Sequence, residues 1–278
     1  MKLAGWLVAL GVALGCAVER GVDRGPAPSK TNEPASSPGA APGGMAARAS
    51  VTSALSSFAL HSEPFLAWQG NGAPSLRAPV GKPLSFRMSI PGVASWAEAN
   101  VGWFAVRLYG GTQESIPVDQ ADSRAFIGYQ FPNAGPAVVM LCAGPKVEPS
   151  GDAWQRVSHC TKTIVRVGNA GLRPDESSDA DITSAAGMPI EVIPLISTLR
   201  LKVGSELPAR FKFLDRKQAG IGVAALRPDG SLDEKITDGA GVAHFQLSQA
   251  GRWIVRFAKA EPDGERVGEL VFEIEGGR

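Results

Sequence analysis

The sequence has almost no excess of charge and few of the residues that usually carry chemistry. Its formal net charge is +1 over 278 residues, so it provides no field that would attract nucleic acid. It contains only three histidines and three cysteines, and no HxH, HxxxH, CxxC or GxSxG spacing occurs. We therefore expect no nucleic-acid partner, no motif-type metal site and no serine-hydrolase elbow.

The sequence also lacks a long amphipathic helical pattern, and this absence argues against a helical fold. The chain has 33 Gly and 21 Pro together with 44% hydrophobic residues, which suits short strands separated by many turns. We expect a mainly β protein. The predicted strands are Phe65–Trp68, Leu84–Ile90, Gly102–Tyr109, Ala125–Phe131, Ala137–Cys142, Lys162–Val167, Ile190–Pro194, Leu199–Val203, Leu207–Phe213, Gly222–Leu226, Val242–Leu247, Arg252–Phe257 and Leu270–Ile274.

Two pairs of segments indicate an internal repeat. Residues 80–87 (VGKPLSFR) align with 203–210 (VGSELPAR), and residues 131–139 (FPNAGPAVV) align with 247–255 (LSQAGRWIV). The shared Val-Gly introduces an early strand and the shared Ala-Gly turns into a late one. The pattern predicts two tandem antiparallel Ig-like or prealbumin-like β-sandwich domains.

The first sixteen residues resemble a bacterial lipoprotein signal. Met1-Lys2 is a short basic region, residues 3–14 are apolar but too short to span a bilayer, and Cys16 follows directly after Gly15. The resemblance implies that Cys16 becomes the lipidated N-terminus, although Leu14 stands where such signals usually place a small residue. The alternative is an ordinary secretory signal in which Cys16 is incidental. Because Ala17 is not an inner-membrane retention signal, the lipoprotein resemblance implies an outer-membrane anchor facing the periplasm.

Cys142 and Cys160 remain after Cys16 is set aside. An even number of cysteines in an exported protein favours a disulfide between them. The alternative is a reactive thiol at Cys160 beside His159. Adjacent residues of a strand point to opposite faces, so His159 is poorly placed to activate Cys160.

The predicted organisation has five parts. Residues 17–57 contain a stretch rich in Pro, Gly, Ser and Ala that cannot bury enough apolar surface to fold, and we expect a disordered tether there. An acidic, Gly-bounded segment separates the two sets of strands. The expected parts are residues 1–16 (signal and lipidation cysteine), 17–57 (tether), 58–168 (first sandwich), 169–187 (linker) and 188–278 (second sandwich).

The chain resembles bacterial domain-of-unknown-function family 4198. The resemblance rests on PIEVIPL at 189–195, LKVGSEL at 201–207, WIVR at 253–256 and SHCTKTIVRVG at 158–168. It implies a periplasmic protein associated with nickel or cobalt uptake, with an envelope protein or transporter as partner. Where family members often carry a histidine after the WIVR motif, this chain has Lys259, and a protonated lysine cannot ligate a metal.

The candidate metal ligands are therefore the three histidines and one neighbouring acid. They are His61, Glu63, His159 and His244. His61 and Glu63 are the first pair to consider, because residues two apart share one face of a strand. Each histidine has the alternative of a structural or solvated role.

Tryptophans provide the other candidate site. Trp68, Trp96, Trp103 and Trp154 could form a sugar-stacking platform, with Trp96 and Trp103 as the ligand-binding candidates, or could belong to the sandwich core. We expect a non-enzymatic, envelope-anchored binding or accessory lipoprotein with no cofactor other than nickel or cobalt by family resemblance. The alternative is a structural or adhesion-type protein that binds a protein or polysaccharide partner.

Overall fold

A computed structural model of the chain describes residues 61–69, 76–91, 93–118, 126–150, 153–168 and 176–276. These residues belong to one compact unit, Gly44–Arg278. The signal segment, Cys16 and the predicted tether lie outside the described residues. The described part is mainly β, as predicted, and none of its helices is long and apolar enough to cross a membrane.

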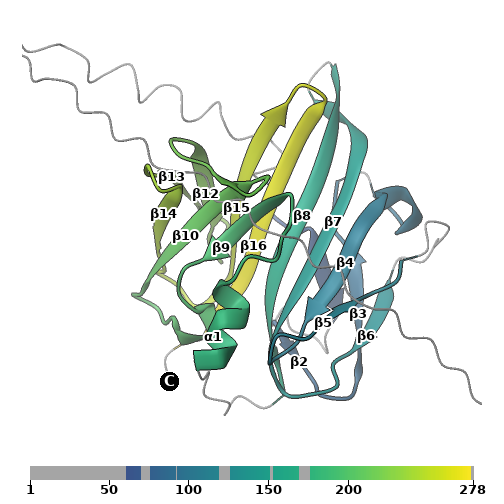
Figure 1. The fold of residues 1–278 in the computed structure, drawn as a ribbon, viewed down its shortest axis with the longest axis vertical. Coiled ribbons are helices and arrows are strands. Elements are labelled where there is room, and N and C mark those ends of the chain that lie inside the picture. The colour runs from purple at the N-terminus through teal and green to yellow at the C-terminus, as the bar shows by residue number, and fades with distance from the viewer. Residues whose placement is uncertain are drawn as a thin grey trace, which may run out of the picture. The chain divides into compact units, whose positions relative to one another are not determined.

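The elements fall into two series along the chain (Figure 1). The first series is β1 (Leu66–Gln69), β2 (Arg77–Ala78), β3 (Pro83–Met88), η1 (Ala97–Ala99), β4 (Val101–Arg107), β5 (Gln113–Ser115), β6 (Ile127–Gln130), β7 (Gly135–Ser150) and β8 (Ala153–Val167). The second series is α1 (Glu176–Thr183), β9 (Ile190–Pro194), η2 (Thr198–Arg200), β10 (Glu206–Phe213), β11 (Arg216–Lys217), β12 (Gly222–Leu226), β13 (Leu232–Ile236), β14 (Val242–Gln246), β15 (Gly251–Glu261) and β16 (Gly264–Ile274).

Both series build the same arrangement of strands. The first forms a small sheet, β1-β3-β6, and the order β5-β4-β7-β8. The second forms a small sheet in which β10 pairs with β9, β11 and β14, and the order β13-β12-β15-β16. These two orders join through a parallel pairing of β8 with β16 into one sheet, which has nine described strands once β2 is included at β8.

The repeat predicted from the sequence is confirmed at the level of individual hydrogen bonds. The amide of Gly81 donates to the carbonyl of Phe131 at 2.9 Å, and the amide of Gly204 donates to the carbonyl of Leu247 at 2.8 Å. These are equivalent residues in the two aligned pairs of segments. Both glycines have positive φ, +67° and +91°, a conformation that a side chain would strain, so the shared Val-Gly has a backbone cause.

The two small sheets cover opposite faces of the shared sheet. In β7, Val139 and Leu141 belong to the core of the first sandwich, whereas Val138 and Met140 between them belong to the core of the second. Because β8 and β16 run parallel, a rotation that exchanges the two series also exchanges the faces of the sheet. The middle of the shared sheet is therefore buried on both sides.

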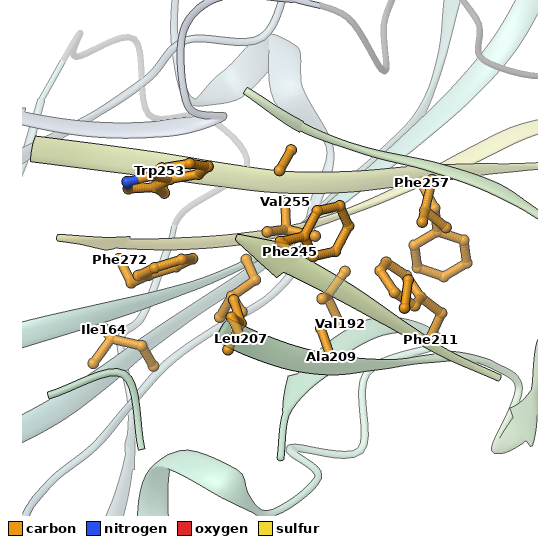
Figure 2. Packing of buried hydrophobic residues seen from close by; sticks show 14 of the residues in the cluster. Ile164, Val192, Leu207, Ala209, Phe211, Phe245, Trp253, Val255, Phe257 and Phe272 are labelled. Atoms are coloured by element: carbon orange, nitrogen blue, oxygen red, sulfur yellow. The ribbon is translucent and has the colours of Figure 1, made fainter. Parts of the chain in front are cut away.

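Figure 2 shows the second core from close by. Three side chains of β15, Trp253, Val255 and Phe257, share a cluster with Phe211 of β10 and Phe245 of β14. The Phe211 ring meets those of Phe257 and Phe245 edge-on, with centroids 5.3 Å and 6.5 Å apart. Alternate side chains of the stretch 253–257 thus pack into the centre of the second core.

Most predicted strands correspond to strands of the structure, with one clear error. The prediction at Leu199–Val203 is wrong, because this segment contains the 3-10 turn η2 and only an isolated bridge at Lys202. Leu201 reaches the core from the end of this turn, while Val203 is exposed. The alternation of apolar and polar residues at 199–203, on which the predicted strand rested, therefore does not correspond to a strand here. The edge strand β13 was missed because its apolar residues Leu232 and Ile236 point to solvent.

The predicted linker, residues 169–187, contains the helix α1. The Asp181 carboxylate accepts a hydrogen bond from the amide of Gly110 at 3.0 Å, and the Arg107 guanidinium donates to the Ser184 hydroxyl at 2.7 Å. The division into domains at 168 and 188 stays a prediction. The structure adds that one sheet runs through both halves.

A buried ion pair between β15 and β16 lies on the face of the shared sheet that the small sheet β1-β3-β6 covers. The Arg256 Nε donates to the Glu269 carboxylate at 2.7 Å, and these side chains are 2% and 0% exposed. Glu269 also accepts from the Thr161 hydroxyl at 2.7 Å and from the amide of Phe65 at 3.0 Å. The Arg256 guanidinium donates to the backbone carbonyls of His61 and Glu63 and lies over the Phe65 ring. This pair fastens the start of the first sandwich to a strand of the second.

A second buried ion pair lies on the opposite face. The Lys162 ammonium donates to the Glu191 carboxylate at 3.0 Å and to the carbonyl of Ser184 at 2.7 Å, with the side chains 0% and 2% exposed. Glu191 also accepts from the amide of Ala186 at 2.8 Å. Burial lowers the pKa of Lys162, and the nearby Glu191 carboxylate acts against that shift.

The two buried pairs occupy equivalent places in the repeat. Met140 and Arg256 are equivalent, because each is the residue directly after one of the aligned segments 131–139 and 247–255. Lys162 is the register partner of Met140, and Glu269 is the register partner of Arg256. Lys162 and Glu269 are therefore equivalent too. By the registers of β1 with β3 and of β9 with β10, Phe65 and Glu191 are also equivalent. The last strand of each sandwich thus carries a buried charge that holds the first strand of the other sandwich.

We predict that Glu269→Gln lowers the free energy of unfolding by about 3 to 5 kcal/mol, because it leaves the buried Arg256 guanidinium without its counter-charge. Urea unfolding followed by circular dichroism measures this loss. The matched control is Glu206→Gln, which breaks the exposed pair with His244 and should cost less than about 1 kcal/mol. Equal losses in the two variants would contradict the assigned role of Glu269.

We also predict that Lys162 makes the protein more stable as the pH rises toward 10.5, the ordinary pKa of a lysine. Between its lowered pKa and this value the unfolded chain binds more protons than the native one, so the free energy of unfolding increases with pH. The reference protein is the double variant Lys162→Met/Glu191→Gln. It retains the other titrating groups, so their contributions cancel when its free energy of unfolding is subtracted from that of the wild type. A difference between the two proteins that stays flat or falls from pH 8 to 10.5 would refute this prediction.

Candidate functional site

A pocket of about 460 Å³ lies over the shared sheet at the junction of the two sandwiches. Its volume is in the range of small-molecule sites. Its floor comes from β4, β7, β8 and β16, and the segment that leads into β9 closes it on the other side. The residues that line it are Gly102, Trp103, Cys142, Ala143, Gly144, Ser158, Cys160, Gly187, Pro189, Ile190 and Arg266.

The strand registers place the floor residues in order. Trp103 of β4 pairs with Cys142 of β7, and Cys142 pairs with Cys160 of β8. Cys160 pairs in turn with Gly268 of β16, so these four residues form one row across four strands. An aromatic ring thus lies at one end of the row and a disulfide in its middle.

The strand β16 supplies the polar end of the pocket. Ser158 and Arg266 are register partners in the parallel pair of β8 and β16, and both line the pocket. The Arg266 guanidinium lies a long 3.8 Å from the Asp263 carboxylate. The Nε of Arg266 is buried and has no hydrogen-bond partner in the described part of the chain. The Arg266 side chain as a whole is 33% exposed, so other atoms of this side chain are accessible to a ligand.

Two β-bulges lie beside the pocket. The register of β4 with β7 shifts between Val101 and Trp103, and that of β7 with β8 shifts between Ala143 and Lys146. Bulges bend a strand and redirect side chains, and they occur often next to binding sites. Here they place Gly102 and Gly144, which have no side chains, where they leave space over the floor.

The structure separates the two tryptophan candidates. Trp96 is 1% exposed and its ring stacks on Phe104 with centroids 5.2 Å apart, so it belongs to the first core. Trp103 is partly buried and lines the pocket. Among the described side chains, Trp103 is therefore the predicted platform residue that lines the pocket, and the prediction for Trp68 and Trp154 concerns side chains outside the described residues.

The metal candidates do not form a ligand set. The Nδ1 of His244 lies 2.7 Å from the Glu206 carboxylate at the surface, and the His159 ring packs edge-on against Phe65 with centroids 4.5 Å apart. The Nδ1 of His61 lies 3.3 Å from the backbone amide of Glu63. No group of three or more His, Cys, Asp and Glu side chains that could hold a metal occurs in the described part of the chain. These residues therefore do not fit the nickel or cobalt that the family resemblance implies.

Cys142 and Cys160 form a disulfide across β7 and β8. His159 points to the opposite face of β8, where it meets Phe65, as expected for neighbouring residues of a strand. The sulfur atoms thus belong to the floor of the pocket, and the reactive-thiol alternative has no adjacent base.

Sequence reasoning missed Ser158 and Arg266. Each is a single polar residue in a strand, and they meet only because strands from the two series pair in parallel. Neither the number of serines or arginines in the sequence nor any short motif indicates this pair. Trp103 and the two cysteines were identified, but their common location was not.

We predict that the double variant Cys142→Ala/Cys160→Ala lowers the free energy of unfolding by about 3 kcal/mol, as expected for a cross-link over a separation of 18 residues. Thermal unfolding under non-reducing conditions measures the loss. Wild type should also show no reactive thiol from these two positions after denaturation without reductant. Titration of two such thiols in native-purified protein would contradict the disulfide.

Comparison with known proteins places the chain in a family. The model of a family described as a domain of unknown function (DUF4198) matches residues 106–260, more than half of the chain. No curated protein matches the sequence. Two fibronectin type III domains of chicken tenascin are similar in structure, with 10% identity, a TM-score of 0.23 and coverage of 75% of this chain and 97% of that one.

Two bacterial structures are also similar at this low level. A Ca²⁺-stabilised, ice-binding adhesin of an Antarctic bacterium has 8% identity and a TM-score of 0.24, with 80% of this chain and 50% of that one covered. A protein of the Bacteroides ovatus mixed-linkage glucan utilization locus, in complex with a heptasaccharide, has 12% identity and a TM-score of 0.19, with coverage of 72% and 44%. On the match of the family model, the chain belongs to the family described as a domain of unknown function (DUF4198).

Proposed function

We propose that this protein is a non-enzymatic, envelope-tethered binding protein whose ligand site is the pocket at Trp103. The observation that carries the proposal is the pocket itself: an aromatic side chain, a disulfide and an arginine side chain line a space of ligand size. Pockets that combine apolar walls with a few polar groups are typical of small-molecule sites.

The composition of the pocket supports binding rather than catalysis. The part of its lining that the structure describes holds no His, Asp, Glu or Lys side chain, so the usual general acids and bases are missing from this part. No described lining residue is a histidine that could activate the Ser158 hydroxyl. A partly exposed tryptophan is well suited to pack on the apolar face of a sugar ring, and an oligosaccharide is the ligand class that we propose.

The location is part of the proposal. The segment that ends in Cys16 supports export with a lipid anchor, and a disulfide is typical of an oxidising compartment such as the periplasm. We propose an outer-membrane lipoprotein that faces the periplasm, with residues 17–57 as its tether. Nickel and cobalt are left out of the proposal, because the candidate ligands are engaged elsewhere.

We predict that the full-length protein binds at least one class on an array of neutral and acidic oligosaccharides, and that Trp103→Ala lowers this binding at least about tenfold, since stacking on an aromatic ring contributes roughly 1 to 3 kcal/mol. Isothermal titration measures the affinities. The matched control is Tyr109→Ala, which removes an exposed aromatic residue outside the pocket and should leave binding unchanged.

Unfolding midpoints of both variants show whether they remain folded. Two results would overturn the proposal: no oligosaccharide binds the wild type, or Trp103→Ala binds as tightly as wild type while folded.

A further inference from the structure

The pocket carries a charge preference that its apolar walls do not reveal. Among the described residues that line it, Arg266 is the only charged one. No carboxylate occurs among the lining residues that the structure describes, and the contact with Asp263 is long and involves an acid side chain that is 63% exposed. A positive group that is only weakly neutralised beside a partly enclosed apolar space favours an anion there.

Resting on the proposed function, we propose that the natural ligand is an acidic oligosaccharide, with the carboxylate of a uronic-acid ring bound at Arg266 and a sugar ring packed on Trp103. The polar end of the pocket fits a carboxylate because Arg266 and Ser158, which are register partners on neighbouring strands, both line it. A carboxylate would form a charge-assisted hydrogen bond with the accessible part of the Arg266 side chain, which is 33% exposed.

The spacing of the strands favours an oligomer over a single ring. Trp103 lies on β4 and Arg266 on β16, with β7 and β8 between them. Neighbouring strands are about 4.8 Å apart, so roughly 14 Å separates the backbones of β4 and β16. Even after two long side chains reach inward, more than one small ring is needed to contact both ends, and the Cys142–Cys160 disulfide provides an apolar floor between them.

The alternative anion is an aromatic carboxylate, and the glycine-rich lining disfavours it. Backbone is exposed toward the pocket where Gly102, Gly144 and Gly187 have no side chain. A sugar has hydroxyl groups that can hydrogen-bond to such backbone, whereas a flat apolar ring has none. We therefore choose the uronic-acid ligand.

The experiment compares oligomers of galacturonate, glucuronate and mannuronate with the same oligomers after methyl esterification, which removes the charge and keeps the rings. For at least one of the three, the free acid should bind wild type about 10- to 100-fold more tightly than its ester, the expected effect of one charge-assisted hydrogen bond in a partly buried site. Raising the salt concentration should reduce this preference.

Two variants identify the residues responsible. Arg266→Gln should abolish the preference for the acid, with a much larger loss of affinity for the acid than for the ester, and Trp103→Ala should weaken both ligands. The matched control is Arg216→Gln on the exposed strand β11, outside the pocket, which should retain the preference.

Each outcome separates this inference from the proposed function. If acid and ester bind wild type equally and Trp103→Ala loses both, the anionic ligand is refuted and the binding function stands. If naphthoate binds more tightly than every uronate in an Arg266-dependent manner, the sugar class is refuted. If nothing binds, both proposals fail.

Discussion

The parallel pairing of β8 with β16 is the constraint on which the rest of this structure depends. Each sandwich alone would end in an edge strand with unpaired backbone groups, and pairing these two edges removes both. Since the strands run in the same direction, the two small sheets must cover opposite faces of the joined sheet. The middle strands are then buried on both sides, which explains the unbroken buried run from His159 to Val165 in β8.

Two buried ion pairs lie at the junction of β8 and β16, which we call the seam, with one pair on each face of the sheet. A charge in such a place is costly unless it is paired and hydrogen-bonded. Glu269 accepts bonds from Arg256, Thr161 and Phe65, while Lys162 donates to Glu191 and Ser184. Each group contacts the beginning of the other sandwich, so the pairs are specific to the joined arrangement. We interpret them as the feature that selects this register over a shifted one, in which both charges would face apolar neighbours.

Local structure could be predicted well because it depends on local patterns. The strand at Ile190–Pro194 and the turn at Gly204 follow from apolar runs and glycine positions, and the repeat followed from aligned turns. The joining of the sandwiches could not be predicted, because nothing in the sequence of β8 or β16 specifies its partner. Lys162 and Glu269 lie in apolar strands and were the strongest hint of a special environment, but without a structure a charge in a strand also fits a solvent-exposed face.

The candidate site is a consequence of the same seam. Trp103 and the cysteines belong to the first sandwich, Arg266 and Ile190 to the second, and the pocket exists only where the sheet is continuous. The bulges at Gly102 and Gly144 widen the floor at this point, and the absence of a side chain at Gly268 lets Ile190 and Phe257 approach β16 closely. A Cβ at Gly268 would lie 2.9 Å from both of those side chains. The segment that closes the pocket, at Ile190, is therefore positioned by packing against β16, and the pocket depends on the two halves remaining joined.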